Sequence, residues 1–329
     1  MSRTTFPRFA LLGTLAATAL VLGAPGAAAQ SAYPDHVVKV ISPQAPGGGV
    51  DLVSRLLADR LSRALGQSFV IDNEGGAGGV IASQQTVRAA PDGYTLMIAY
   101  VGTHGTGPAV RKTSYDVKKD FTPIAMIGGV ANVLVEGKAV PANNLAEFVA
   151  YAKQHPGKLS YGTSGNGTLN HLVMEQFKQV AKVTSLSVPY RSMGQAITDL
   201  IGGQIQTVFP GVATALPHVR AGSVRPLAIT GDKRHPLLPD VPTFKELGYP
   251  NLNALTWYGV VGPAKMPPAI VAKLNAEINK ILTSAEFEQK LSSEGVETMP
   301  MSPSQFGAYI SHDIAQWTKV AHDSNIKLD

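Results

Sequence analysis

The sequence predicts an α/β protein of two lobes, each a mixed β-sheet flanked by helices, with a ligand cleft between the lobes. Short β-branched segments alternate with segments of helical periodicity in two successive runs, as in sheets that are covered by helices on both faces. A further apolar strand, Trp257–Val261, comes after the second run has closed, which indicates that the chain returns to the first lobe. Clefts between lobes are common sites for small ligands.

The first run starts with Val37–Ile41, which is short, β-branched and closed by Pro43, as expected of a buried strand. Apolar residues then recur at helical spacing, at positions 53, 56, 57 and 61, and predict a helix. The run continues with a strand at Phe69–Asp72, a glycine-rich turn at Gly75–Gly79, a helix at Val80–Ala89 and a strand at Tyr94–Ala99.

The second run starts near Asn132 and alternates in the same way. Its strands are predicted at Val133–Val135, Leu159–Gly162, Ser185–Pro189, Ile205–Phe209 and Val224–Thr230, and its helices at Leu145–His155, Leu169–Val180, Gly194–Ile201 and Ala213–Ala221. A proline-rich passage leads to Trp257–Val261, and helices follow at Pro268–Leu282, Ala285–Ser293 and Ser302 to about Asn325. We therefore expect residues 30–131 and 256–329 to form lobe 1 and residues 132–255 to form lobe 2.

The chain begins with the features of an export signal. Arg3 and Arg8 precede an apolar segment, which ends at the small residues Ala27 and Ala29. The segment is too short and too rich in alanine and glycine for a membrane span. We expect residues 1–29 to be removed near Ala29, and the mature protein to work in the periplasm.

Composition narrows the possible functions further. Without residues 1–29 the chain has 26 basic and 23 acidic residues, a net charge of +3, which gives little support to nucleic-acid binding. The absence of cysteine excludes disulfides, thiolate metal sites, a cysteine nucleophile and a lipid anchor at the processing site. We expect a free, exported monomer that uses no cofactor.

A glycine-rich loop, Pro46–Asp51, stands between the first strand and the first helix. Glycines there let a ligand approach the backbone, and a helix N-terminus offers free N–H groups to an anion. The alternative is a plain tight turn with Asp51 in the first turn of the helix. A dinucleotide fingerprint is not met, because Leu52 stands where the third glycine belongs, and no phosphate-loop motif is present.

The segment Tyr161–His171 is the counterpart in lobe 2. Small hydroxyl and amide side chains, flanked by glycines, lead directly into a helix and could donate several hydrogen bonds to one carboxylate. The alternative is that Asn166 or Thr168 only caps the helix and that His171 is a surface residue.

Two other strand ends could reach the same cleft. Thr103 and His104 follow the strand at Tyr94–Ala99, although a lone histidine in a loop is more often structural. Tyr190 and Arg191 offer an aromatic face and a cation that can pair with a carboxylate, although an exposed arginine is usually only solvated. The sequence has neither a Gly-x-Ser-x-Gly nor a His-Glu-x-x-His pattern, so serine hydrolase and zinc peptidase chemistry find no support.

These segments together resemble one family, the periplasmic solute-binding receptors of tripartite tricarboxylate transporters, also called Bug or TctC-like proteins. The similarity runs in order along nearly the whole mature chain, through Pro43–Asp51, Asp72–Gly79, Ala90–Leu96, Gly102–His104, Ser164–Gly167, Val188–Tyr190, Asp199–Gln204 and Leu238–Thr243. It implies a type II periplasmic-binding-protein fold. It also implies that the protein captures a small mono-, di- or tricarboxylate, without chemistry, and delivers it to membrane transporter subunits.

The resemblance also implies which residues bind the ligand, largely through backbone amides and small polar groups. By position these are Ala45, Gly47, Gly48, Gly49 and Thr103 in lobe 1, and Thr163, Ser164, Asn166, Tyr190 and Arg191 in lobe 2. No residue is expected to be catalytic or to bind a metal.

The chain departs from the family at two positions. Phe209-Pro210-Gly211 lacks the acid that relatives commonly carry there, which makes an amino acid ligand less expected. Arg191 stands where relatives usually have lysine, which permits a forked grip on a carboxylate. The main alternative function is an exported α/β hydrolase or isomerase acting on a small organic acid, with His104 as its best titratable group. An interaction-only scaffold is a third possibility.

Overall fold

The computed structural model describes residues 1–2 and 33–328. Of the predicted export signal, residues 3–29 lie outside the described residues, so the signal and its processing near Ala29 stay predictions. Apart from residues 1–33, the chain forms one compact unit, Pro34–Asp329. Among the described helices, none has both the length and the apolar character that crossing a bilayer requires.

The unit contains two β-sheets, and the first has six strands in the order β11-β4-β10-β3-β1-β2. Strands β1, β2 and β3 are parallel, and β10 is antiparallel to both β3 and β4. The strands span Val38–Ser42 (β1), Phe69–Asn73 (β2), Thr95–Tyr100 (β3), Phe121–Ala131 (β4), Leu255–Pro263 (β10) and Val296–Thr298 (β11). The return of the chain near residue 257 is thus realised as β10, in the middle of the first sheet.

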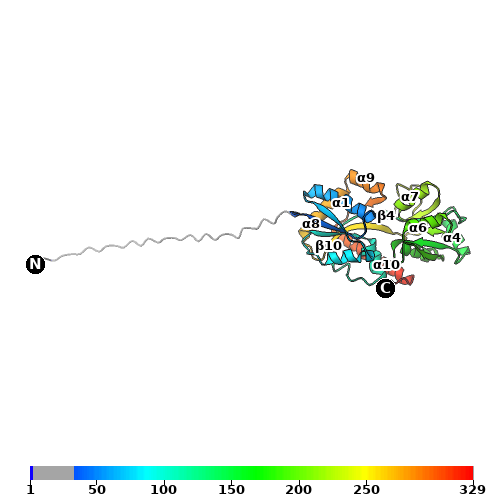
Figure 1. Cartoon of the computed structure of the whole chain (residues 1–329), viewed down its shortest axis with the longest axis horizontal. Helices are drawn as coiled ribbons and strands as arrows, with labels where there is room; N and C mark the ends of the chain where they lie inside the picture. The colour runs from blue at the N-terminus through cyan, green and yellow to red at the C-terminus, as the bar shows by residue number, and fades with distance from the viewer. Residues whose placement is uncertain (3–32, 329) are drawn as a thin grey trace. The chain divides into compact units, whose positions relative to one another are not determined.

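Helices α1, α8 and α9 lie around this sheet (Figure 1). The helices that follow strands of the first sheet are Gly49–Leu65 (α1), Val80–Val87 (α2), Gly107–Val110 (α3), Pro268–Leu282 (α8), Ala285–Ser293 (α9) and Pro303–Asp323 (α10). Local chemistry fixes their ends: α1 stops at Gly66, which adopts the left-handed conformation, and α10 starts with a capping box between Ser302 and Gln305.

The second sheet has five strands in the order β7-β6-β8-β5-β9. Strands β6, β7 and β8 are parallel, and β5 runs antiparallel to β8 and β9. The strands span Val133–Gly137 (β5), Ser160–Thr163 (β6), Leu186–Pro189 (β7), Thr207–Val208 (β8) and Val224–Ile229 (β9), and the helices Leu145–Gln154 (α4), Leu169–Ala181 (α5), Met193–Ile201 (α6) and Val212–Arg220 (α7).

The chain passes between the sheets at two neighbouring places, 131–133 and 254–255. Asn132 links them, because its backbone N–H donates to the Thr230 hydroxyl at 2.8 Å and its side-chain amide donates to the Ala254 carbonyl at 3.1 Å. The Thr230 hydroxyl donates to the same Ala254 carbonyl at 2.6 Å. The strands of the first sheet lie within residues 38–131 and 255–298 and those of the second within residues 133–229, and the predicted lobe limits at residues 131/132 and 255/256 stay a prediction.

The carboxyl ends of the parallel strands in both sheets lie next to this crossing. Tyr100, the last residue of β3, pairs with Tyr258 of β10. In the other sheet, Gly211 follows β8 and forms a bridge with Asn132. The loops that leave β1 and β3 and those that leave β6, β7 and β8 are therefore brought to the same region.

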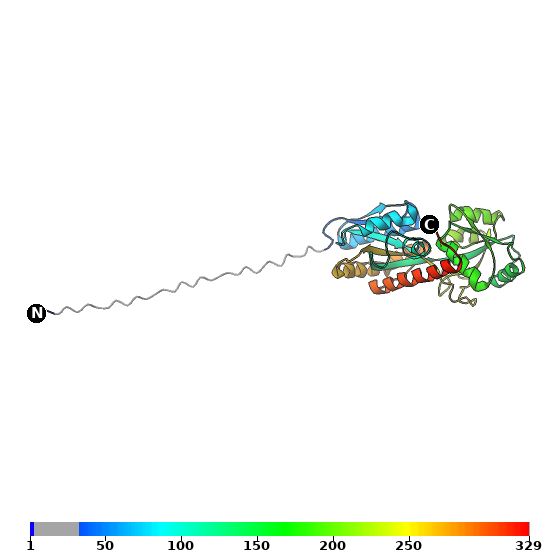
Figure 2. The ribbon, with the colours of Figure 1, turned by 90° about the horizontal axis from the view of Figure 1, so that it is seen from below.

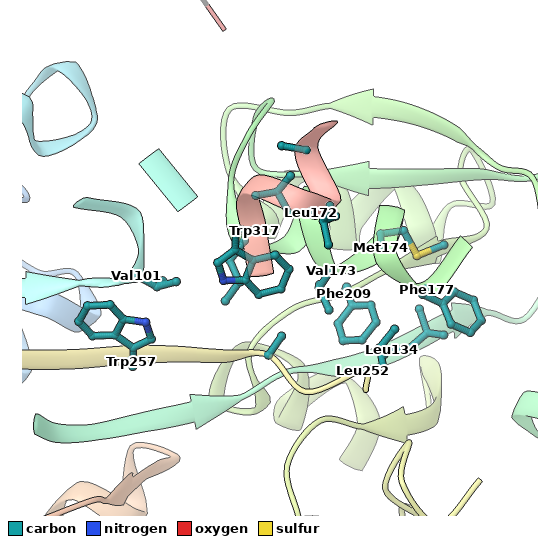
Figure 3. Close-up of a cluster of buried hydrophobic side chains, with 14 of the residues drawn as sticks. Val101, Leu134, Leu172, Val173, Met174, Phe177, Phe209, Leu252, Trp257 and Trp317 are labelled. Atoms are coloured by element: carbon teal, nitrogen blue, oxygen red, sulfur yellow. The ribbon is translucent and has the colours of Figure 1, made fainter. Parts of the chain in front are cut away.

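A continuous apolar core runs from one sheet to the other. Helix α10, red in Figure 2, extends along the first sheet toward the elements of the second. Its Trp317 is fully buried and lies beside Leu172 and Val173 of α5, while Phe209 and Phe177 extend the cluster (Figure 3). The two sheets are thus joined by packed side chains as well as by two passages of chain.

Sequence reasoning missed β4, the longest strand. Pro123, Gly128 and Gly129 interrupt its apolar pattern, and such residues usually weaken a strand. The structure explains Gly128, because a Cβ atom there would lie 2.2 Å from the Glu297 carbonyl oxygen of β11. A close approach of two strands requires glycine at this point, so the residue that hides the strand also permits its pairing.

Candidate functional site

The loop between β1 and α1 is held from behind by a buried carboxylate. Asp51 accepts hydrogen bonds from the Gly47 N–H at 3.0 Å, the Asn73 amide at 2.9 Å and the Arg55 Nε–H at 3.0 Å. The Arg55 hydrogen bond is the main cause that lowers the pKa of Asp51 to about 2, so this group is ionised at neutral pH. The Asn73 amide also donates to the Gln44 carbonyl at 3.0 Å, which fixes the loop at its other end.

The backbone of the loop between β1 and α1 is exposed to solvent. Ala45, Gly47 and Gly49 are exposed and Gly48 is half-buried. Because α1 begins at Gly49, the N–H groups of its first turn have no acceptor within the helix. Asp51 uses the N–H of Gly47, so the donors left for an anion are those of the following residues.

Two tyrosines stand against this loop, and sequence reasoning did not single them out. A Cβ atom at Gly49 would lie 3.0 Å from the Tyr258 hydroxyl oxygen. Tyr258 and Tyr100 are paired across β10 and β3, and burial raises the pKa of Tyr258 to about 12. Both hydroxyls are therefore neutral donors at physiological pH. The signal that could have found Tyr100 is its position at the end of β3, next to the glycine loop.

The predicted loop at Gly102–Gly107 is instead helical, over Gly102–Thr106 and then α3. Thr103 is fully buried, and its hydroxyl both accepts from the Tyr100 N–H at 3.2 Å and donates to the Tyr100 carbonyl at 3.1 Å. Its methyl group packs where a side chain at Gly79 would stand. Thr103 thus lies behind the glycine loops, and its ligand role stays a prediction.

His104 is fully buried beside Thr103 and packs edge-on against Phe121, with ring centroids 4.5 Å apart. Burial lowers its pKa to about 3, so the ring is neutral at physiological pH. A group so placed is a core residue, and the hydrolase or isomerase alternative loses its best titratable side chain.

The lobe 2 loop between β6 and α5 is organised by Asn170, a residue of α5. Its side-chain oxygen accepts from the Ser164 N–H at 3.0 Å, and its amide donates to the Ser164 hydroxyl at 2.7 Å. Thr163 is fully buried and its hydroxyl accepts from the Gly165 N–H at 3.2 Å. These hydrogen bonds hold the loop in this conformation without a ligand.

Fewer backbone donors are free in this loop than the sequence suggested. The Gly167 N–H donates to Nδ1 of His171 at 3.0 Å, and the Thr168 N–H donates to the Gly165 carbonyl at 3.4 Å. With Ser164 and Gly165 also engaged, the backbone N–H left in the described loop 164–168 is that of Asn166, whose side chain is exposed. His171, expected on the surface in the alternative reading, is buried and serves the loop.

Tyr190 and Arg191 follow β7 beside this loop. The Tyr190 N–H donates to the Thr163 carbonyl at 2.8 Å, which joins the two segments. Its hydroxyl donates to Asp199 of α6 at 2.8 Å, and burial together with that carboxylate raises the pKa of Tyr190 to about 12. Arg191 is exposed.

A series of contacts connects the two glycine loops. A Cβ atom at Gly75 would lie 3.3 Å from the Ala45 nitrogen, so the turn 75–79 packs on the first loop. At the far end, a Cβ atom at Gly167 would lie 2.8 Å from Cγ2 of Val110, and the neighbouring Arg111 reaches back to Gly78. The structure thus brings the lobe 2 loop to the same side of the molecule as the lobe 1 loops.

A separate cavity of about 450 Å³ lies at the crossing strands. It is lined by residues of the first sheet, of the segment after β9 and of α10, among them Leu255, Thr230, His235 and Asp313, and by none of the ten predicted site residues. The described residues contain no group of three or more histidine, aspartate or glutamate side chains placed to hold a metal ion.

Comparisons with known proteins agree on one family. Residues 53–326 match the sequence profile of the tripartite tricarboxylate transporter family receptor. The chain is 32% identical over 321 residues to protein BugT of Bordetella pertussis, which covers 97% of this chain and 98% of BugT.

Solved structures give the same result. A protein of R. palustris solved with adipate is 36% identical, with a TM-score of 0.78, and the match covers 90% of this chain and 99% of that one. MatC of Rhodopseudomonas palustris, solved with bound malate, is 32% identical, with a TM-score of 0.73, over 88% and 99% of the two chains. The two-lobe fold predicted from the sequence is thereby confirmed.

Proposed function

Because the chain belongs to the tripartite tricarboxylate transporter receptors, a family of periplasmic solute-binding proteins rather than enzymes, we propose that it captures a small organic carboxylate and delivers it to a membrane transporter of that type. The observation that carries the proposal is the match over about nine tenths of the chain to proteins solved with adipate and with malate. Both of those ligands are dicarboxylates, and a dicarboxylate is the ligand class that we propose for this chain.

The proposed site lies between the two glycine loops. One carboxylate sits at the start of α1, where the backbone of Ala45 and Gly47–Gly49 is exposed and the helix N-terminus favours an anion. The Tyr258 hydroxyl, beside Gly49, is well placed to donate a further hydrogen bond.

Lobe 2 closes the site with a second group of residues. In this proposal Thr163, Ser164, Asn166, Tyr190 and Arg191 form the wall opposite α1. Thr163 and Ser164 form part of the wall without binding the ligand through these groups, since their hydrogen bonds go to Gly165 and Asn170. The exposed Asn166 and Arg191 donate hydrogen bonds to the ligand. A ligand that contacts both lobes only when they are closed shifts the population toward the closed state.

The remaining parts of the proposal concern the cellular context. The mature protein, residues 30–329, acts as a free periplasmic monomer, without a lipid anchor and without a cofactor. Its partners are the carboxylate and the transporter subunits.

Binding of adipate and malate to the mature protein tests the proposal. Isothermal titration should show saturable binding of at least one dicarboxylate, with a matching rise in Tm, because a ligand that binds only the folded state stabilises it. Mass spectrometry after incubation should return the acid unchanged. No binding of adipate, malate or any other acid in a panel of mono-, di- and tricarboxylates would refute the proposal, and consumption of an acid would favour the enzyme alternative.

A further inference from the structure

Arg111, which none of the sequence motifs includes, is held firmly by its backbone at the junction of the two lobes. Its N–H donates to the Gly107 carbonyl at 3.1 Å, and the residue forms a parallel bridge with Leu328 near the C-terminus. The preceding Val110 accepts a hydrogen bond of 2.7 Å from the Leu328 N–H. Val110 is also the residue that packs against Gly167 of the lobe 2 loop.

The guanidinium of Arg111 lies over the glycine turn of lobe 1. Its Nη1 atom is 3.0 Å from the place that a Cβ atom of Gly78 would occupy, and the Cζ atom is 3.7 Å from it. Glycine at position 78 therefore leaves room for the guanidinium, and the positive φ of 66° requires glycine as well. The cation stands between the turn 75–79 and the segment that meets the lobe 2 loop.

This cation has no counter-charge in the described part of the chain. Its Nε atom is buried and makes no hydrogen bond there, and no ion pair joins Arg111 to any described acidic side chain. A buried donor on a charged group without a partner costs stability, and a ligand that accepts a hydrogen bond from it would remove that cost. The arrangement suits an anion that arrives from outside.

The guanidinium is also electrostatically close to the lobe 1 site. Burial raises the pKa of Tyr100, and the Gln44 side chain and the Arg111 charge both oppose that rise. Gln44 precedes the first glycine loop, so both the start of that loop and Arg111 lie near Tyr100. The charge of Arg111 acts in the same way on Tyr115.

We propose that Arg111 is a specificity-determining residue, whose guanidinium pairs with the second carboxylate of a dicarboxylate while the first occupies the start of α1. A guanidinium offers two parallel N–H donors that match the two oxygens of a carboxylate, and such pairs are stronger than neutral hydrogen bonds. The inference rests on the proposed function. It adds the residue that makes the protein bind a dicarboxylate more tightly than a monocarboxylate.

Arg111→Gln removes the charge and keeps a polar, although shorter, side chain. Adipate and its monomethyl ester have the same chain and differ in one negative charge, so both are titrated against the mature wild type and the variant. Loss of a charged hydrogen-bond pair should weaken adipate about 10- to 100-fold. The monomethyl ester should lose less than about threefold, and Arg111→Lys should fall between wild type and Arg111→Gln for adipate.

The matched control is Arg88→Gln, which removes an exposed arginine that follows α2 in the same lobe. It should leave both affinities unchanged. Equal losses for the two ligands in Arg111→Gln, or no loss of adipate affinity, would overturn the assignment of Arg111.

The stability of the unliganded protein gives an independent readout. If the Arg111 guanidinium has no partner until a ligand binds, Arg111→Gln should keep or raise the Tm of the unliganded protein, because the substitution removes an uncompensated cation. A large drop in that Tm would show a structural role and overturn the inference. Failure of the wild type to bind adipate or any dicarboxylate would instead refute the proposed function itself.

Discussion

The indole N–H of Trp257 donates a hydrogen bond of 2.8 Å to Oδ2 of Asp313, which connects β10 to α10 in the interior. Trp317, one turn further along α10, donates to the other oxygen of the same carboxylate at 2.8 Å. Both indoles are fully buried. Asp313 therefore joins the strand that returns to the first sheet with the helix that packs against both sheets.

This carboxylate predicts a pH dependence of stability. Burial raises the pKa of Asp313 from 3.8 to about 6. Between about pH 4 and pH 6 the folded state then binds more protons than the unfolded state, so the contribution of Asp313 to stability falls as the pH rises through this window.

Asp313→Asn should remove that contribution. The variant loses one indole hydrogen bond at any pH, at a cost of about 1 kcal/mol. Because the wild type carries an unfavourable buried charge above pH 6, the measured destabilisation should be larger at pH 4.5 than at pH 7, in urea titrations of both proteins. An equal difference at the two pH values would contradict the raised pKa.

A glycine makes room for the same carboxylate. A Cβ atom at Gly105 would lie 2.2 Å from Oδ2 of Asp313, so Gly105→Ala must push α10 away or break the Trp257 hydrogen bond. Overpacking of this kind should cost about 1–3 kcal/mol of unfolding free energy. Gly194→Ala is the control, since the nearest atom to a Cβ there, Oγ of Ser192, is 3.9 Å away. Comparable stability of the two variants in denaturant titrations would rule out the contact.

The contact between the lobe 2 loop and lobe 1 can be tested in the same way. A Cβ atom at Gly167 would lie 2.7 Å from Cδ1 of Leu328 and 2.8 Å from Cγ2 of Val110, whereas one at Gly203 meets nothing within 4 Å. The two glycines have nearly equal positive φ, 73° and 76°, so both alanine variants suffer similar backbone strain. Gly167→Ala should therefore be about 1 kcal/mol or more less stable than Gly203→Ala in thermal unfolding. The reverse order would show that the two lobes do not meet at this loop.

The charge at the start of α1 is tested by two substitutions of nearly equal size. Gly48 has ordinary φ and a Cβ there would lie 3.2 Å from the flexible end of Gln44, so both Gly48→Asp and Gly48→Asn should fold. Two negative charges about 4 Å apart repel by about 1 kcal/mol or more. Adipate should therefore bind Gly48→Asp at least about fivefold more weakly than Gly48→Asn at low salt. Equal affinities would place the carboxylate elsewhere.

Much of the fold could be predicted because the alternation of strands and helices is local. The segment Val37–Ile41 and the helix after it follow from side-chain periodicity alone. Strand β4 could not be predicted in this way. Glycine is required at position 128 because the Glu297 carbonyl oxygen lies so close, and Glu297 is far away in sequence. The return of the chain at Trp257 could be predicted because an apolar strand comes after the second run of strands and helices has closed.

The candidate site could be predicted only in part, because some of its features depend on contacts between residues that are far apart in sequence. The glycine loops are visible in sequence because glycine and helix starts are local signals. The engagement of Ser164 by Asn170 depends on side-chain geometry that no motif shows. Arg111 belongs to no sequence motif. It becomes a candidate ligand-binding residue only in the structure, where its Nε atom is buried and its guanidinium lies beside Gly78.

A crystal structure of the mature protein grown with adipate tests the central claim most directly. We predict one carboxylate of the ligand against the backbone of Gly47–Gly49, with the rest of the ligand facing residues 163–166. A ligand bound instead in the cavity lined by His235 and Asp313, with the glycine loops empty, would contradict the account.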